Sequence, residues 1–151
     1  MNKRQKAVLR NFASVTLLTF LAIIALTNFR NHINLSEATR AMNHLSAKVQ
    51  DYRQKNGMVP PESYIETIRP TLQGGARLGD LIYRARWIDY DSTDDEILAY
   101  AKNNRGVLFK KRGSIVLRLG GEVEWIEARQ FNKILSQQQS KAEIEMIREL
   151  E

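Results

Sequence analysis

The chain contains no cysteine, and it has only two histidines and three prolines among its 151 residues. Without cysteine there is no disulfide, no thiolate metal site and no cysteine nucleophile. The histidines, His32 and His44, are twelve residues apart and match no HExxH or similar ligand spacing, so we expect no transition-metal site. Hydrophobic residues make up 43% and charged residues 26% of the chain, a balance typical of a folded protein rather than a disordered one.

Motifs of the common enzyme classes are also missing. The sequence has no G-x-S-x-G elbow, no Walker loop, no GxGxxG fingerprint and no Ser/His/Asp set marked by its spacing. We therefore expect a protein that is not an enzyme and holds no organic cofactor.

Acidic residues are absent from the first 30 positions, although the chain has 17 of them. The formal net charge is +6, with 23 basic residues. Five of these precede residue 31, so the remainder of the chain has a net charge of only +1. The basic surface expected of a nucleic-acid-binding protein is therefore not predicted.

Residues 12–29, FASVTLLTFLAIIALTNF, form an uncharged run of 18 residues without proline or glycine. As a helix at ~1.5 Å per residue the run is about 27 Å long, close to the hydrocarbon thickness of a bilayer. A cleaved signal peptide and a buried core helix are alternatives, but no small-x-small cleavage site follows and no other segment is as apolar. We predict an uncleaved signal anchor. Its large apolar side chains are Phe12, Leu17, Leu18, Phe20, Leu21, Ile23, Ile24, Leu26 and Phe29.

The charges on either side of this run predict its orientation. Four basic residues precede it, Lys3, Arg4, Lys6 and Arg10, whereas only Arg30 and His32 follow closely. By the positive-inside rule the N-terminus is cytoplasmic. We predict a cytoplasmic leader over 1–11, a transmembrane helix over 12–29, an amphipathic helix over 30–57 and an exported head over 58–151. Such a single-pass protein belongs in a bacterial inner membrane, with its head in the periplasm or outside the cell.

An apolar stripe at alternating spacings of three and four follows the apolar run, which indicates one face of a helix. Its members are Leu35, Ala38, Met42, Leu45, Val49 and Tyr52. The helix either starts afresh near Asn34 or continues from about Ala7, and Asn56-Gly57 followed by Pro60-Pro61 ends it. We expect the stripe to pack on the protein's own sheet; a parallel coiled-coil homodimer is the alternative.

Strand patterns dominate the rest of the chain before a helical tail. The expected strands are 81–90, 96–102, 114–119 and 122–126, with a two-residue hairpin at Gly120-Gly121; the expected helices are 63–72, interrupted at Pro70, 128–139 and 141–150. Trp87 and Trp125 are expected to fill the core against the helix stripe. A long N-terminal helix packed on an antiparallel sheet, with a short helical C-terminus, makes the fold class α+β.

Two charged segments are candidate binding sites. Asp89, Asp91, Asp94 and Asp95 are weak candidates for calcium, because calcium prefers several carboxylate oxygens, although a solvated turn is the better interpretation. Lys110, Lys111 and Arg112 form a basic tip between two strands. We interpret the tip as a solvated loop, with contact to anionic lipid or an acidic partner as the alternative.

The order of these segments resembles the type IV pilin and type II secretion pseudopilin superfamily. Residues 41–61, AMNHLSAKVQDYRQKNGMVPP, are similar to the end of the long pseudopilin helix, and 91–100, DSTDDEILAY, to the entry of a strand. Gly120-Gly121 stands where many such proteins have Asp-Gly, and Lys110 where they have a histidine. The resemblance implies a pilin-like fold, a structural or assembly role, and partners among the lipid bilayer and other membrane or pilin-like subunits.

Two positions differ from the prepilin pattern. Asn11 replaces the glycine that precedes the cleavage point, and Thr16 replaces the glutamate at the fifth mature position. The first difference predicts poor cleavage, and the second removes the carboxylate that pairs with a neighbouring subunit in that family. We therefore expect a static membrane protein; a processed minor pseudopilin and a membrane-anchored ligand-binding module are the alternatives.

Overall fold

The computed structural model describes residues 2–89, 91–103 and 112–150. The chain divides into two compact units, Met1–Asn34 and Leu35–Glu151. A single helix, α1 (Lys3–Asn56), includes both the apolar run and the apolar stripe, so no separate helix starts near Asn34. It ends where Gly57 adopts a φ of 72° and donates its N–H to the carbonyl of Arg53 at 2.8 Å, as a left-handed helix end requires.

The second unit is an α+β head. Its elements after α1 are α2 (Glu62–Ile68), the 3₁₀ turns η1 (Arg69–Thr71) and η2 (Gly75–Arg77), β1 (Leu81–Tyr83), the 3₁₀ turn η3 (Ala85–Trp87), β2 (Ile97–Asn103), β3 (Gly113–Arg118), β4 (Val123–Glu127), α3 (Ala128–Gln138) and α4 (Lys141–Leu150). The four strands form one antiparallel sheet in the order β1-β2-β3-β4. The predicted α+β class is thus observed.

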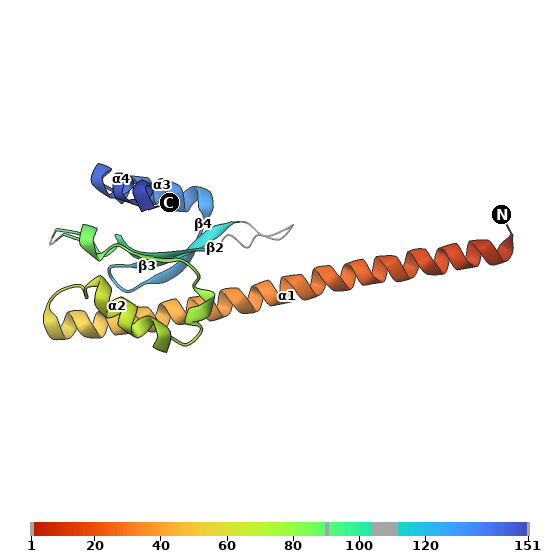
Figure 1. The fold of residues 1–151 in the computed structure, drawn as a ribbon, viewed down its shortest axis with the longest axis horizontal. Helices are drawn as coiled ribbons and strands as arrows, with labels where there is room; N and C mark the ends of the chain where they lie inside the picture. The colour runs from red at the N-terminus through yellow and green to blue at the C-terminus, as the bar shows by residue number, and fades with distance from the viewer. Residues whose placement is uncertain (1, 90, 104–111, 151) are drawn as a thin grey trace. The chain divides into compact units, whose positions relative to one another are not determined.

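The sheet is covered on both faces (Figure 1). The head part of α1, with α2, lies on one face, and α3 and α4 lie on the other. Alternation along β3 produces this arrangement, because Ile115 and Leu117 point toward α1 whereas Val116 packs with Phe131 of α3. The sequence predicted only the first of these two layers.

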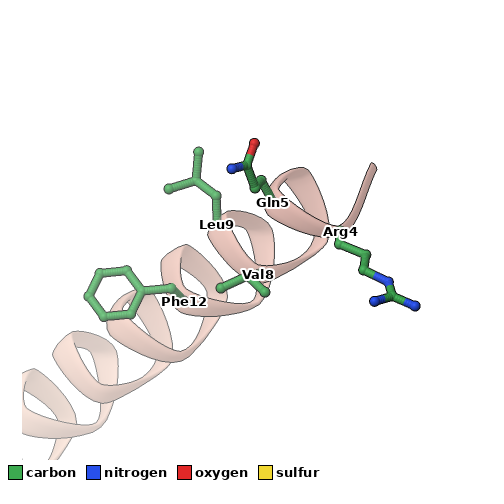
Figure 2. Close-up of a pocket in the computed structure, with 5 residues that line it drawn as sticks. All are labelled: Arg4, Gln5, Val8, Leu9 and Phe12. Carbon is green, nitrogen blue, oxygen red and sulfur yellow. The ribbon is translucent and has the colours of Figure 1, made fainter. Parts of the chain in front are cut away.

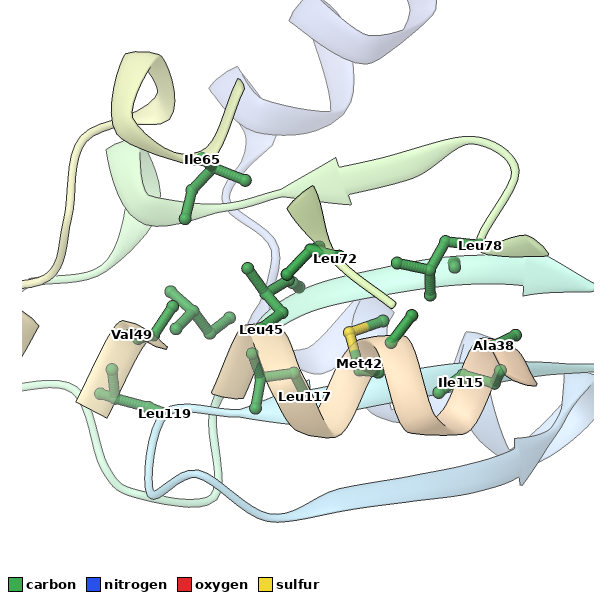
Figure 3. Packing of buried hydrophobic residues seen from close by; sticks show 14 residues of the cluster. Ala38, Met42, Leu45, Val49, Ile65, Leu72, Leu78, Ile115, Leu117 and Leu119 are labelled. Atoms are coloured by element: carbon green, nitrogen blue, oxygen red, sulfur yellow. The ribbon is translucent and has the colours of Figure 1, made fainter. Parts of the chain in front are cut away.

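The apolar stripe of α1 forms the centre of the larger core. Ala38, Met42, Leu45 and Val49 are buried against Ile115, Leu117 and Leu119 of the sheet side (Figure 3). Leu35 packs at the edge of this core, and the ring of Tyr52 lies 4.8 Å from that of Tyr64 on α2. The stripe is therefore occupied within one chain, and a homodimer needs another surface.

The first predicted strand is much shorter than expected. Pairing ends at Tyr83, and the chain then turns through η3 instead of continuing to residue 90. Arg84 leaves the extended region with φ −105° and ψ 18°, and its side chain turns into the protein. The placement of the tryptophans was also wrong, since Trp87 lies half-buried in η3 and Trp125 is 40% exposed on β4.

The hairpin between β3 and β4 has a three-residue loop rather than two. Arg118 donates its N–H to the carbonyl of Glu122 at 2.8 Å, so Leu119, Gly120 and Gly121 form the loop. Gly121 has a φ of 97°, which a side chain rarely tolerates. The two glycines were the correct signal, but only the second one needs the left-handed conformation.

Candidate functional site

The apolar run of α1 has no packing partner within its own unit. Large side chains such as Phe12, Leu21 and Leu26 are more than half exposed in the described structure. The run belongs to the one described helix that is long and apolar enough to cross a membrane. The N-terminal part of α1 is therefore the candidate functional site: a helix surface whose large apolar side chains are exposed in the described structure.

Two of the four hydroxyl side chains inside this run donate to the helix itself. Thr19 donates its hydroxyl to the carbonyl of Val15 at 2.9 Å, and Thr27 donates to that of Ile23 at 2.7 Å. These bonds occupy the hydroxyl hydrogens of Thr19 and Thr27, so neither is left unsatisfied against lipid. The two threonines are thus compatible with an apolar surrounding.

The turns of α1 that lead into the run carry both polar and apolar side chains. Figure 2 shows Arg4, Gln5, Val8, Leu9 and Phe12 on successive turns of α1, with the guanidinium and the aromatic ring pointing away from each other. The shallow hollow between these five side chains is lined by α1 alone, so it does not enclose a ligand. The predicted topology residues Lys3, Arg4, Lys6 and Arg10 all lie in the first turns of α1, before the uncharged run.

The acidic segment does not form a metal site in the part of the chain that the structure describes. No three His, Asp or Glu side chains there are close enough to hold an ion. Asp91, Asp94 and Asp95 are exposed. Asp94 makes its contact through the main chain, since its carbonyl accepts the N–H of Gly120 at 2.9 Å. Asp89 shares a turn with Ser92, whose side-chain oxygen accepts the N–H of Asp89 at 3.0 Å.

The predicted basic tip lies mostly outside the described residues. Lys110 and Lys111 fall in the undescribed range 104–111. Arg112 is exposed, and its carbonyl accepts the N–H of Ala128 at 2.8 Å, where β4 passes into α3.

A buried ion pair that the sequence did not predict joins α4 to the sheet. Arg84 is 1% exposed and Glu143 0% exposed. The guanidinium donates twice to the carboxylate, from Nε to Oε1 at 2.6 Å and from Nη2 to Oε2 at 2.9 Å. Further donations reach the carbonyls of Ile97 at 2.5 Å and Gln138 at 3.2 Å, so the guanidinium makes two hydrogen bonds to main-chain oxygens besides its two to the carboxylate. Arg84 and Arg86 alternate in the sequence as surface residues of a strand would, and no pattern distinguished the buried one.

A second polar cluster fixes the β3–β4 loop to the end of α1. Ser46 donates to the carbonyl of Gly121 at 2.6 Å, while Gln50 and Arg53 both donate to that of Leu119, at 3.0 and 2.5 Å. A hollow of about 380 Å³ beside them is lined by Gln50, Arg53, Gln54, Gly57, Asp94 and Gly120. Because the described polar groups there bond mainly to the chain itself, we interpret the cluster as structural.

Tyr83, half-buried on β1, forms a polar contact with the segment that follows α1. Its hydroxyl donates to the carbonyl of Pro60 at 2.8 Å. Burial raises the pKa of the Tyr83 phenol well above its usual value, against the lowering influence of the nearby Arg53. The group therefore stays protonated and acts as a donor, and it has no basic form to offer for catalysis near neutral pH.

No protein-family model, curated protein or solved structure matches this chain. Arguments about function therefore rest on the residues and contacts described above.

Proposed function

We propose that this chain is a single-pass membrane protein without enzymatic activity, whose head serves as a structural or assembly component of a bacterial envelope complex. The observation that supports the proposal is the uncharged, outward-facing apolar run at 12–29 within α1. Exposing so large an unpacked apolar surface to water is unfavourable. A bilayer, whose hydrocarbon core is about as thick as the run is long, would take that surface out of water.

The charges at the ends of the run favour one orientation. Basic residues cluster before Phe12, and the first acidic residue of the chain is Glu37. A cytoplasmic N-terminus with an exported head satisfies the positive-inside rule. The head would then lie in the periplasm of a bacterial cell.

Single cysteines test this orientation cleanly, because the natural chain has none. Gln5→Cys reports on the N-terminal side, and Ser136→Cys, at an exposed position of α3, reports on the head. In intact spheroplasts a membrane-impermeant maleimide should label Ser136→Cys and leave Gln5→Cys unlabelled until the cells are lysed. Ser63→Cys, exposed on α2, is a second head position and should behave like Ser136→Cys. Labelling of Gln5→Cys in intact spheroplasts would show that the proposed orientation is wrong.

A charge placed at the middle of the run tests the anchor itself. Leu21 lies near its centre, and an arginine there costs about 2.5–3.5 kcal/mol of insertion free energy. We expect Leu21→Arg to move a large fraction of the protein out of the washed membrane pellet. Asn28→Arg adds the same charge at the end of the run, where the side chain reaches the interface, and should leave the protein in the pellet. Equal fractions for both variants would contradict a membrane-spanning helix.

The assembly role follows from the resemblance to pilins together with the layout of the head. A long N-terminal helix that continues from an apolar segment and packs on an antiparallel sheet supports a pilin-like arrangement. Asn11 and Thr16 favour a subunit that stays in the membrane over one that is processed and extracted into a fibre.

The intact mass of the protein from native membranes separates these two roles. A full-length mass is the expected result. A mass lacking residues 1–11, with or without a methyl group on Phe12, would instead support the processed minor pseudopilin. Asn11→Gly restores the residue expected before the cleavage point, and it serves as the positive control for processing in the same cells.

A further inference from the structure

Strand β3 runs between two ends of the head that differ in charge. At the end of β3, the N–H of Leu119 donates to the carbonyl of Glu96 at 2.8 Å, so the acidic segment 89–96 lies beside the β3–β4 loop. Five of the eight residues of this segment are acidic and none is basic. Gly113, where β3 begins, is six residues before Leu119 and therefore about 20 Å away. We call the acidic side the hairpin end of the head.

The start of β3 lies where α1 enters the head. Ser46 of α1 donates to the carbonyl of Gly121 in the β3–β4 loop at 2.6 Å, whereas Ala38 packs near Ile115, close to the start of β3 (Figure 3). The helix and the strand thus run in the same direction. At ~1.5 Å per residue, α1 covers the length of β3 in about 13 residues, which leads back from Ser46 to the beginning of the head near Leu35. We call this side the entry end.

The covalent chain keeps the entry end close to the apolar run. Phe29 is the last residue of the run, and Leu35, six residues later, already packs on the core of the head. Six residues span at most about 22 Å, even when fully extended. The inference therefore rests on the proposed function in one respect: if the run is a membrane anchor, the surface of that membrane is always within reach of the entry end.

Two arginines are exposed at the entry end. Arg112 comes immediately before β3, and its carbonyl accepts the N–H of Ala128 at 2.8 Å, which brings Arg129 in the first turn of α3 to the same end. No carboxylate among the described residues is paired with either arginine, whereas Glu37 at this end is paired with Arg77 at 3.1 Å. Both guanidinium groups can therefore accept an anionic partner.

The entry end is less acidic than the hairpin end. Asp80 and Glu127 lie there, but they are not part of an acidic run like that of segment 89–96. Residues 104–111 lead into Arg112; they are outside the described residues and the proposed surface does not include them, but their sequence has three basic residues and no acidic one. An anionic surface would thus attract the entry end and repel the hairpin end.

Trp125 adds an exposed aromatic ring to the entry end. It is paired with Ile115 across the sheet, and its indole covers Gly113, where any side chain would collide with the ring. Trp125 is nevertheless 40% exposed, although most large apolar side chains of the described sheet are buried. Tryptophan is enriched at membrane–water interfaces because its ring is apolar and its N–H is polar.

We propose that the entry end of the head docks on the surface of the membrane that holds the anchor, with Arg112 and Arg129 on the phosphates of anionic phospholipids and Trp125 among their headgroups. The planar donors of a guanidinium suit a phosphate group. Two arginines and one tryptophan bind a membrane weakly from solution, but the anchor holds the head at a high effective concentration beside the bilayer. An acidic protein would have the same charge, but the chain does not hold such a protein within reach.

Fluorescence quenching by labelled lipid tests the docking on the full-length chain. In a Trp87→Phe background, Trp125 is the only tryptophan. The protein is reconstituted into vesicles of phosphatidylcholine, or of equal parts phosphatidylcholine and phosphatidylglycerol, with the same small fraction of a lipid that carries a nitroxide on its headgroup. We expect quenching of Trp125 to be several-fold stronger in the anionic vesicles and to fall to the level of the neutral ones at high salt, because salt screens these contacts.

Matched charge changes show whether the entry end makes the contact. Arg112→Glu with Arg129→Glu should abolish the difference between the two vesicles, whereas Arg112→Lys with Arg129→Lys keeps the charge and should retain most of it. Lys48→Glu with Lys141→Glu makes the same change in formal charge at two exposed residues nearer the hairpin end and should also retain it. Lys48 follows Ser46 by two residues, and Lys141 follows the end of α3.

Flotation of the same vesicles separates the two proposals. Protein that floats with both kinds of vesicle, but shows equal Trp125 quenching in them, overturns the docking and leaves the anchor in place. Quenching that persists in Arg112→Glu with Arg129→Glu, or that is lost equally in Lys48→Glu with Lys141→Glu, also overturns the docking. Protein that does not float overturns the anchor and, with it, the docking.

Discussion

The apolar residues of the two units are treated in opposite ways. In residues 2–34 most large apolar side chains are exposed and the charges lie outside the central run, whereas in the head most apolar side chains are buried on both faces of a sheet. Leu21 is 53% exposed and Leu45 0% exposed, although both belong to α1. Leucines on one helix are thus in two different environments: the head buries Leu45, whereas the first unit leaves Leu21 exposed.

Charges follow the same division. The basic residues of the first unit precede the apolar run or follow it, and none interrupts it. The head instead encloses a full ion pair, Arg84 with Glu143, and satisfies it with further hydrogen bonds. A charge is tolerated in the head interior because its partner is folded beside it, whereas the apolar run contains no acidic or basic residue to pair with a charge placed there.

Removing one member of the buried ion pair should have the largest effect on the head. Glu143→Ala leaves the Arg84 guanidinium buried and unpaired, and we expect the free energy of unfolding to fall by about 3–5 kcal/mol. Urea unfolding of the full chain in detergent measures this, and tryptophan fluorescence reports on the head alone because Trp87 and Trp125 are the only tryptophans.

Two controls sharpen this test. Glu145→Ala removes an exposed glutamate from the same helix and should change the free energy of unfolding by less than about 0.5 kcal/mol. The double variant Arg84→Met with Glu143→Leu removes both charges and should recover most of the loss. A single Glu143→Ala variant as stable as the natural chain would mean that α4 is not held by this pair.

Shortening a leucine in each unit tests the comparison most directly. Leu45→Ala removes a fully buried side chain and should lower the free energy of unfolding of the head by about 2–5 kcal/mol. Leu21→Ala makes the same chemical change where the protein provides no packing, and the urea midpoint should not move. If both variants shifted the midpoint equally, the apolar run would have a packing partner within the protein.

Local patterns were enough to predict α1, three of the four strands and both C-terminal helices. The apolar spacing from Leu35 to Tyr52 indicates a helix through helix geometry alone, and the glycines at 120 and 121 indicate a hairpin loop through turn geometry alone. The uncharged run at 12–29 is likewise a property of neighbouring residues. Features of this kind need no knowledge of what packs where.

The second layer of the head could not be predicted in that way. Along the expected strand at 81–90, Arg84 and Arg86 alternate with apolar residues, and a period of two does not say whether the polar face meets water or another helix. Glu143 is 59 positions further along the chain, and only the fold brings its carboxylate to Arg84. Trp125 was wrongly assigned to the core for a related reason, since a strand pattern does not reveal which strand will be at the edge.

The smallest effect we expect is a pH dependence of the head's stability that comes from the hydroxyl of Tyr83. This hydroxyl is bonded to a distant segment of the fold, whereas hydroxyls of the apolar run are bonded within their own helix. Tyr83, whose hydroxyl donates to the carbonyl of Pro60, retains its proton to higher pH when folded because burial raises its pKa above the ordinary value of 10.0. The unfolded chain releases that proton first, so the free energy of unfolding is unaffected below about pH 10 and falls above it, by less than about 1.4 kcal/mol per pH unit because the ring is only partly buried. Urea midpoints at pH 9, 10 and 11 measure this slope; Tyr83→Phe should make it shallower, and Tyr64→Phe, which removes a phenol on α2, should not. An unchanged slope in Tyr83→Phe would mean that the Tyr83 hydroxyl is solvated in the folded head. The head would then not hold this polar group by its fold, and the contrast with Thr27, whose hydroxyl is bonded within its own helix, would disappear.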